Sequence, residues 1–156
     1  MKTALAWNVA ILSALAIALA FDWRALASSE LVQFPEGYKQ GVHYATAKRG
    51  NITEELFTSR DAIEAAKAGR ALPSGTVITM EDYRNGELYR YVVMEKRTGW
   101  GADYSPEKRN GEWEFQSFAP DRTVNRSESL DRCFACHKGQ ASQDFVFTLP
   151  RMKSAK

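Results

Sequence analysis

The residues best suited to chemistry lie near the end of the chain, in the string Cys133-Phe134-Ala135-Cys136-His137. Cys133 and Cys136 are the only cysteines among the 156 residues. Two thiols one helical turn apart can add to the two vinyl groups of one haem, and the adjacent imidazole can then bind the iron as an axial ligand. The string therefore predicts one covalently attached haem c, with both cysteines as thioether anchors and His137 as the proximal iron ligand.

Three other uses of such a cysteine pair fit this chain less well. A redox-active dithiol usually follows a thioredoxin-like strand, and a zinc site needs a second pair of ligands. His43 is the only other histidine, so the zinc alternative has little support. A disulfide between such near neighbours would constrain little chain. We therefore favour haem attachment.

The first residues have the composition of an export signal. Lys2 precedes an uncharged, mostly apolar run over residues 4–21, and Ala25-Leu26-Ala27 matches the small-x-small pattern of a cleavage site. We interpret residues 1–27 as a cleaved signal and residues 28–156 as the functional domain, which then has no membrane attachment. The alternative is an uncleaved anchor, because the apolar run approaches the length of a membrane span.

The charge balance argues against one large class of partners. Lysine and arginine number 21 against 19 aspartates and glutamates, a formal charge of +2, and both signs are interspersed. A nucleic-acid-binding domain normally has a strongly basic face. We therefore expect no nucleic-acid partner. With 44% hydrophobic and 26% charged residues, the composition is that of an ordinary globular domain.

Signals upstream of the haem string predict a helix and a hairpin. The segment Thr58-Ser59-Arg60-Asp61 offers an N-cap with an acidic N3 partner, which favours a helix over residues 61–68 that Gly69 then ends. The β-rich segments 76–83 and 87–96 flank Asn85-Gly86, the strongest short hairpin signal. These two strands would lie side by side and antiparallel.

A two-residue loop also predicts which residues of the hairpin share a face. Arg84 would pair with Glu87, and counting back along both strands gives the remaining pairs. The predicted face holds Met80 opposite Tyr91, Ile78 opposite Val93 and Thr76 opposite Glu95. The other face would hold Met94 and an exposed ion pair between Glu81 and Arg90.

The rest of the chain predicts a third strand and a second helix. Asn110-Gly111 is a turn before the alternating residues 112–118. A helix capped by Ser127 or Ser129 would run through His137 and end at the following glycine. Residues 145–149 look like a short strand, and the basic tail 151–156 looks frayed and solvated. The expected fold is α+β, mainly an antiparallel sheet with two helices and a haem near the C-terminus.

Several of these segments together resemble the cytochrome P-460 and cytochrome c′-beta family. The resemblance spans roughly residues 40–150. It rests on Ser74-Gly75-Thr76-Val77, on Gly111-Glu112-Trp113, on the haem string with Lys138, and on Asp144-Phe145-Val146-Phe147-Thr148. The resemblance implies a mainly antiparallel-β fold, a homodimer, a single haem c and a periplasmic location.

The resemblance also implies which residues lie on the distal side of the haem. The family's hydroxylamine-oxidising members carry a lysine cross-linked to the haem, and the matching position here looks like Met80. Their acidic distal residue, which assists proton transfer, looks as if it falls on Glu95. Without the lysine the cross-link cannot form, which argues against hydroxylamine oxidation.

Three functions follow from this arrangement. In the first, Met80 is the sixth iron ligand, and the His/Met haem transfers single electrons to and from a redox partner protein. In the second, Met80 only lines an apolar pocket with Ile78, Tyr91 and Val93, and the five-coordinate haem binds nitric oxide or carbon monoxide. The third, less favoured, is hydroxylamine oxidation with Glu95 as proton acceptor. The sequence thus leans towards a carrier or gas binder rather than an enzyme.

Overall fold

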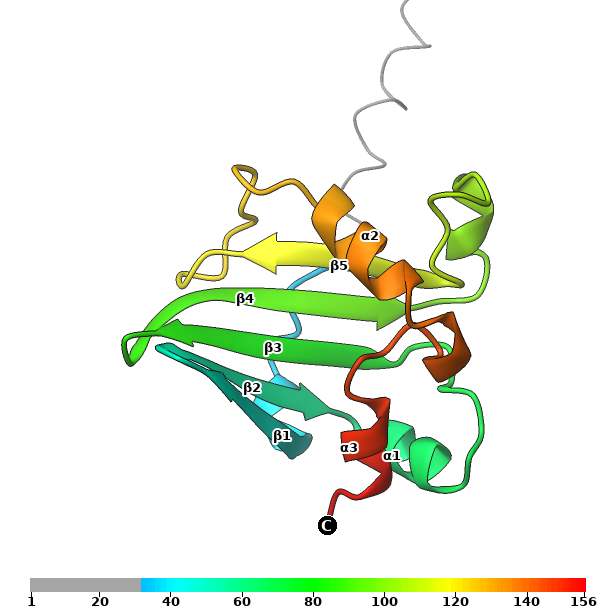
Figure 1. Cartoon of the computed structure of the whole chain (residues 1–156), viewed down its shortest axis with the longest axis horizontal. Helices are drawn as coiled ribbons and strands as arrows, with labels where there is room; N and C mark the ends of the chain where they lie inside the picture. Colours follow the sequence, from blue (N-terminus) through cyan, green and yellow to red (C-terminus); the bar gives the residue numbers. More distant parts are fainter. Residues whose placement is uncertain (1–31) are drawn as a thin grey trace, which may run out of the picture. The chain divides into compact units, whose positions relative to one another are not determined.

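A five-stranded antiparallel sheet with helices on one side forms the domain that the computed structural model describes, residues 32–156 (Figure 1). The predicted export signal lies outside these residues. The sheet order is β1-β2-β3-β4-β5, so every strand pairs with its neighbour in sequence. The predicted α+β class with a mainly antiparallel sheet is therefore confirmed. The elements are η1 (Tyr38–Gln40), β1 (Val42–Arg49), β2 (Ile52–Thr58), α1 (Arg60–Lys67), β3 (Val77–Arg84), β4 (Glu87–Lys96), η2 (Trp100–Asp103), β5 (Trp113–Phe118), α2 (Asp131–Lys138), η3 (Ala141–Gln143) and α3 (Leu149–Lys153).

The predicted helix and hairpin before the haem string are both present. The Ser59 side chain accepts a hydrogen bond from the Ala62 N–H at 3.2 Å and caps α1. Asn85 and Gly86 both have positive φ, 53° and 86°, as the tight turn between β3 and β4 requires. A second hairpin, β1 and β2, has no counterpart among the sequence predictions.

The predicted register between β3 and β4 is wrong beyond the first two pairs. Tyr83 pairs with Leu88 but Asp82 pairs with Arg90, so the strand carries Tyr89 as an extra residue. Such a bulge moves every later residue to the other face. The Arg84 guanidinium lies 3.6 Å from the centre of the exposed Tyr89 ring and covers the bulge.

The two faces of the sheet consequently hold different residues from those predicted. Met80 pairs with Val92, and Ile78 pairs with Met94. The face that carries these residues packs against the helices. The buried residues of this first cluster include Tyr44, Ala45, Leu56, Ile63, Leu72, Ile78, Met94, Trp113, Phe115, Val146 and Met152, and Met80, Cys133 and Phe134 pack against them.

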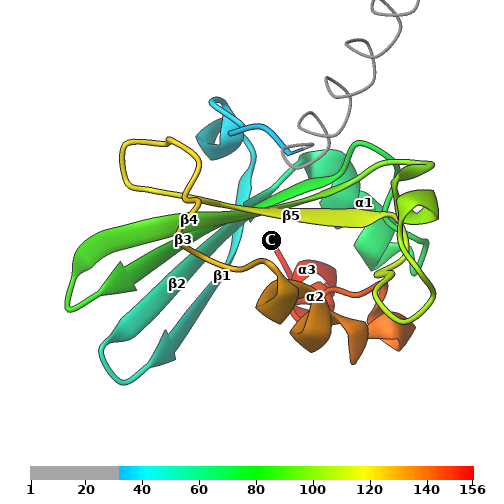
Figure 2. The same ribbon diagram turned by 90° about the horizontal axis from the view of Figure 1, so that it is seen from above.

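The opposite face is covered by the segment that leads into β1. Phe34 and Tyr38 pack there against Tyr91 and Phe118, with ring centres 5.0 to 6.0 Å apart. Figure 2 shows this segment on one side of the sheet and α2 and α3 on the other. The domain therefore has two apolar clusters, one on each face of a single sheet.

The C-terminal predictions need correction. Residues 145–149 form no strand, because Asp144 and Phe145 have positive φ and Pro150 lies in the first turn of α3. The tail is not a frayed segment either. Met152 is 0% exposed, and α3 packs against α1. Within residues 32–156, no helix has the length and apolar character needed to cross a membrane.

Candidate functional site

Helix α2 presents the predicted haem-binding string. Cys133 is half-buried and Cys136 is exposed, and both are free thiols. The cap position of α2 is held by Leu130, one residue after Ser129, and not by either predicted serine, Ser127 or Ser129. Leu130 makes no side-chain bond there. Ser129 still accepts a hydrogen bond from the Asp131 N–H at 3.3 Å. Cys133 and Cys136 therefore lie one turn apart on an α-helix, as haem attachment requires.

The surroundings of Cys133 argue against a redox-active dithiol. Burial raises the pKa of the Cys133 thiol, with nearby Arg90 opposing and Glu128 reinforcing the shift. A reactive redox cysteine normally has a lowered pKa, because the thiolate is the nucleophile. Cys133 lacks that property.

His137 is oriented as a proximal ligand would be. Its Nδ1 lies 2.7 Å from the Phe145 carbonyl oxygen, so Nδ1–H is the donor and Nε2 keeps the lone pair. Burial lowers the pKa of His137, and the bond to the carbonyl opposes that shift. A neutral ring with a fixed tautomer is the form that binds iron.

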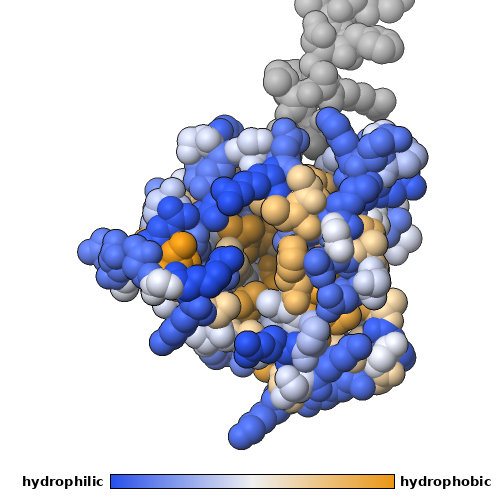
Figure 3. Space-filling model, viewed as in Figure 1, coloured by the Kyte–Doolittle hydropathy of each residue, from blue (hydrophilic) through white to orange (hydrophobic). Residues whose placement is uncertain are grey.

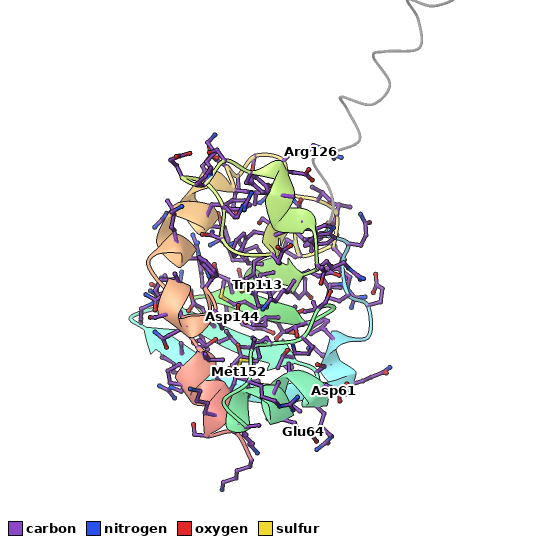
Figure 4. The ribbon with its side chains drawn as sticks, turned by 90° about the vertical axis from the view of Figure 1, so that its right-hand side faces the viewer. Asp61, Glu64, Trp113, Arg126, Asp144 and Met152 are labelled. Atoms are coloured by element: carbon purple, nitrogen blue, oxygen red, sulfur yellow. The ribbon has the colours of Figure 1, made fainter. Side chains whose placement is uncertain are left out.

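The backbone that supplies the carbonyl has an unusual conformation. Asp144 and Phe145 have φ of 52° and 60°, a left-handed region that bulky residues rarely adopt. Each such residue costs on the order of 1 kcal/mol. The Asp144 side chain lies beside Trp113 (Figure 4), whose indole N–H donates to it at 3.4 Å. Side-chain contacts thus hold a strained loop directly behind His137.

An apolar hollow lies in front of the sheet, next to the His137 helix. Figure 3 shows it as an orange-lined depression surrounded by polar surface. The His137 ring contacts Phe115 and Phe147, with ring centres 4.7 and 5.0 Å apart. Phe147 is 51% exposed, although large apolar side chains are normally buried. A flat apolar group bound beside His137 would cover this ring.

These features fit the haem that the sequence predicts. The domain supplies two free thiols on one helix, an imidazole whose Nδ1 is already hydrogen-bonded, an exposed phenylalanine against that imidazole, and an apolar hollow next to the helix. Cys133 and Cys136 would hold the group, and His137 would bind its iron.

The structure places only some of the predicted distal residues on this face. Met80 is half-buried and lies on the face that carries the first cluster, together with the buried Ile78. Tyr91 and Val93 lie in the second cluster on the opposite face, so their predicted place beside Met80 is wrong. Met94, expected on the far face, is instead buried with Ile78.

Glu95 also lies on the face away from Met80. It pairs across the strands with Glu114 and accepts a bond from the Arg97 guanidinium at 2.5 Å. Burial raises the pKa of Glu114, with the Tyr104 hydroxyl opposing and Asp103 reinforcing that shift. The bulge at Tyr89 is the physical reason that Glu95 and Met80 are separated.

A buried carboxylate that does share the face of Met80 is Asp82, which is absent from the sequence predictions. Asp82 is 2% exposed, and Arg90 donates to it at 2.9 Å. Its other oxygen has no protein partner. Arg90 also bonds Glu128, which accepts from the Ser117 hydroxyl at 2.8 Å. Because alternate residues of a strand share a face, the spacing Ile78-Met80-Asp82 along β3 could have predicted Asp82 on the face of Met80.

Comparison with known protein families supports the cofactor. Residues 35–148 match the model of Cytochrome P460, a range that includes both cysteines, His137 and Met80. A search of curated proteins finds no match. The family implies a haem, which the thiols, the imidazole and the hollow of this domain fit. The chain therefore belongs to the cytochrome P460 family.

Proposed function

We propose that this protein is an exported c-type cytochrome that carries one haem c and transfers single electrons. The thioether bonds would form at Cys133 and Cys136, and His137 and Met80 would bind the iron from its two sides. The observation that carries the proposal is the His137 geometry, in which Nδ1–H is bonded to the Phe145 carbonyl and Nε2 is left to bind metal.

Of the three methionines in residues 32–156, Met80 is better placed than the buried Met94 and Met152 to be the second iron ligand. Met80 is half-buried and packs at the margin of the first cluster, whereas Met94 is fully enclosed by that cluster. A half-buried thioether can turn towards a ligand without opening a cavity in the core. A haem with His and Met ligands supplies reversible one-electron transfer at a raised potential.

Gas binding is the second candidate, and the apolar surroundings of Met80 favour it. Leu56 and Val92 pair with Met80 from the two neighbouring strands. If Met80 does not bind iron, these aliphatic side chains leave a site suited to small uncharged ligands such as nitric oxide or carbon monoxide. Hydroxylamine oxidation has less support, because Glu95 lies on the other face and the family resemblance implies Met80 at the position of the cross-linking lysine.

Location and assembly are part of the proposal. The sequence of residues 1–27 has the pattern of an export signal, and covalent haem attachment of this type suits a periplasmic protein. We propose a homodimer that exchanges electrons with a redox partner protein. Nucleic acid is not among the proposed partners.

The electronic spectrum of the purified ferric protein distinguishes the candidate functions. Electron transfer through His137 and Met80 predicts a low-spin spectrum with a weak red methionine-to-iron band, lost in Met80→Ala and kept in the matched control Met94→Leu. A high-spin, five-coordinate spectrum that Met80→Ala leaves unchanged would instead support gas binding. Hydroxylamine turnover by the wild type would revive the third function.

A further inference from the structure

Asp144 connects three separate parts of the domain to the loop behind His137. Its carboxylate accepts two bonds from the Lys96 ammonium group at the end of β4, at 2.7 and 2.9 Å. It also accepts the Leu72 backbone N–H at 3.1 Å and the Trp113 indole N–H at 3.4 Å. Figure 4 shows Asp144 and Trp113 next to each other. This carboxylate therefore has donors on both oxygens.

The next residue supplies the acceptor for His137. Phe145 follows Asp144 directly, and its carbonyl oxygen accepts the His137 Nδ1–H at 2.7 Å. Both loop residues have positive φ, which is unfavourable for residues other than glycine. The direction of the Phe145 carbonyl therefore depends on contacts that stabilise this conformation. The Phe145 N–H donates to the Gln140 carbonyl at 2.8 Å. This bond fixes the N–H group of Phe145 but not its carbonyl group.

We propose that Asp144 is a positioning residue, which sets the orientation and electron donation of His137 towards the haem iron by fixing the Phe145 carbonyl. The inference rests on the proposed haem function. The hydrogen bonds of Asp144 go to Leu72, Lys96 and Trp113 rather than to His137, so its action is indirect. Lys96 is 14% exposed in its side chain and neutralises the carboxylate charge, so the contribution is geometric rather than that of a negative charge near the iron.

Loss of the Lys96–Asp144 ion pair should be measurable at His137 itself. Without the Lys96 bond the loop can relax towards ordinary backbone angles, and the Phe145 carbonyl turns away from Nδ1. The hydrogen bond from Nδ1–H to the carbonyl raises the basicity of the imidazole. When that bond is lost, the imidazole donates less electron density to iron. The Nδ1 proton also loses its protection from solvent.

The test uses the haem-loaded protein and four variants, two of them at Lys96. Lys96→Met removes the ion pair, and Lys96→Arg keeps a cation within reach of Asp144. Asp144→Asn is the second way to break the pair, and Lys67→Met, on the exposed side of α1, is the control. The readouts are the solvent exchange of the His137 Nδ1 proton by NMR and the reduction potential.

We expect Lys96→Met and Asp144→Asn to speed that exchange by about tenfold or more. In Asp144→Asn, which leaves no unpaired carboxylate, the equilibrium constant for reduction should rise about threefold, roughly 30 mV for one electron. Lys96→Arg and Lys67→Met should match the wild type. Unchanged Nδ1 proton exchange in a loaded Lys96→Met protein would overturn this inference alone, even where Asp144→Asn does not fold. A wild type without covalent haem would overturn the proposed function, and this inference with it.

Discussion

Met80 and Glu95 project from opposite faces of the five-stranded sheet. The extra residue Tyr89 in β4 separates them, because a bulge exchanges the faces of all residues that follow it. Met80 packs against the first cluster, while Glu95 lies on the other face between Val77 and Glu114. The two residues therefore cannot act on one ligand in a single pocket.

Glu95→Gln should accordingly leave the haem properties unchanged. The substitution removes a carboxylate bonded to Arg97 and paired with Glu114, away from the α2 face. We expect the ferric spectrum and the reduction potential to equal those of the wild type, while Met80→Ala changes both. A shifted spectrum in Glu95→Gln would show that this glutamate reaches the haem after all.

Asp82 and Arg90 should show strong energetic coupling. Arg90→Met leaves a carboxylate that is 2% exposed without its main partner, and a broken buried ion pair costs about 3–5 kcal/mol. Asp82→Asn also breaks the pair, although Glu128 still compensates Arg90. Urea unfolding of the two single variants and the double variant measures the coupling. Additive losses would contradict a buried, mutually dependent pair.

Each cysteine should contribute one covalent bond to the haem. In Cys133→Ala and Cys136→Ala, we expect one thioether bond to remain, with a shifted absorption band of the reduced haem. The double variant should release its haem on denaturation in acid. Mass spectrometry of the denatured chain detects this directly. Haem that is retained by the denatured double variant would show that other residues attach it.

Stability should depend on the ionisation of Glu81. Burial opposes ionisation of this carboxyl, but donors from Tyr38, Lys39 and Tyr83 together hold its pKa below the usual value. A lowered folded-state pKa stabilises the fold above the unfolded-state value of about 4.3, and this stabilisation is lost as the pH falls through the folded-state pKa.

Glu81→Gln should therefore destabilise the protein by about 2 kcal/mol at pH ~7, the scale of a hydrogen bond to a charged group. The difference from the wild type should shrink in acid. Urea unfolding curves at neutral and acidic pH measure it. Glu64→Gln, on the exposed side of α1 (Figure 4), serves as the control. A loss for Glu81→Gln that stays constant across this pH range would contradict the assignment.

Local signals in the sequence predicted local structure well. The predicted capping segment 58–61 does cap its helix, Asn85-Gly86 makes its turn, and the haem string lies on a helix, because each of these features depends on neighbouring residues. The face assignments failed because no local rule places the bulge at Tyr89. The bulge brings Asp82 opposite Arg90, and the partners of Arg90 include Glu128 from a distant loop.

The same distinction explains the C-terminal errors. Phe145, Phe147 and Leu149 alternate as a strand would, yet Asp144 and Phe145 adopt left-handed conformations. Contacts with Lys96 and Trp113, far away in the sequence, stabilise that loop. Met152 is buried for a similar reason, since α3 packs on α1. Such long-range contacts override a short alternating pattern.

Iron X-ray absorption spectroscopy of the ferric protein tests most directly whether His137 and Met80 are the two axial ligands. The spectrum resolves a sulfur neighbour of iron from the nitrogen neighbours of the haem and imidazole. We predict one sulfur at bonding distance in the wild type and in Met94→Leu, and none in Met80→Ala. A wild-type spectrum without sulfur at bonding distance, or one that Met80→Ala leaves unchanged, would contradict the account.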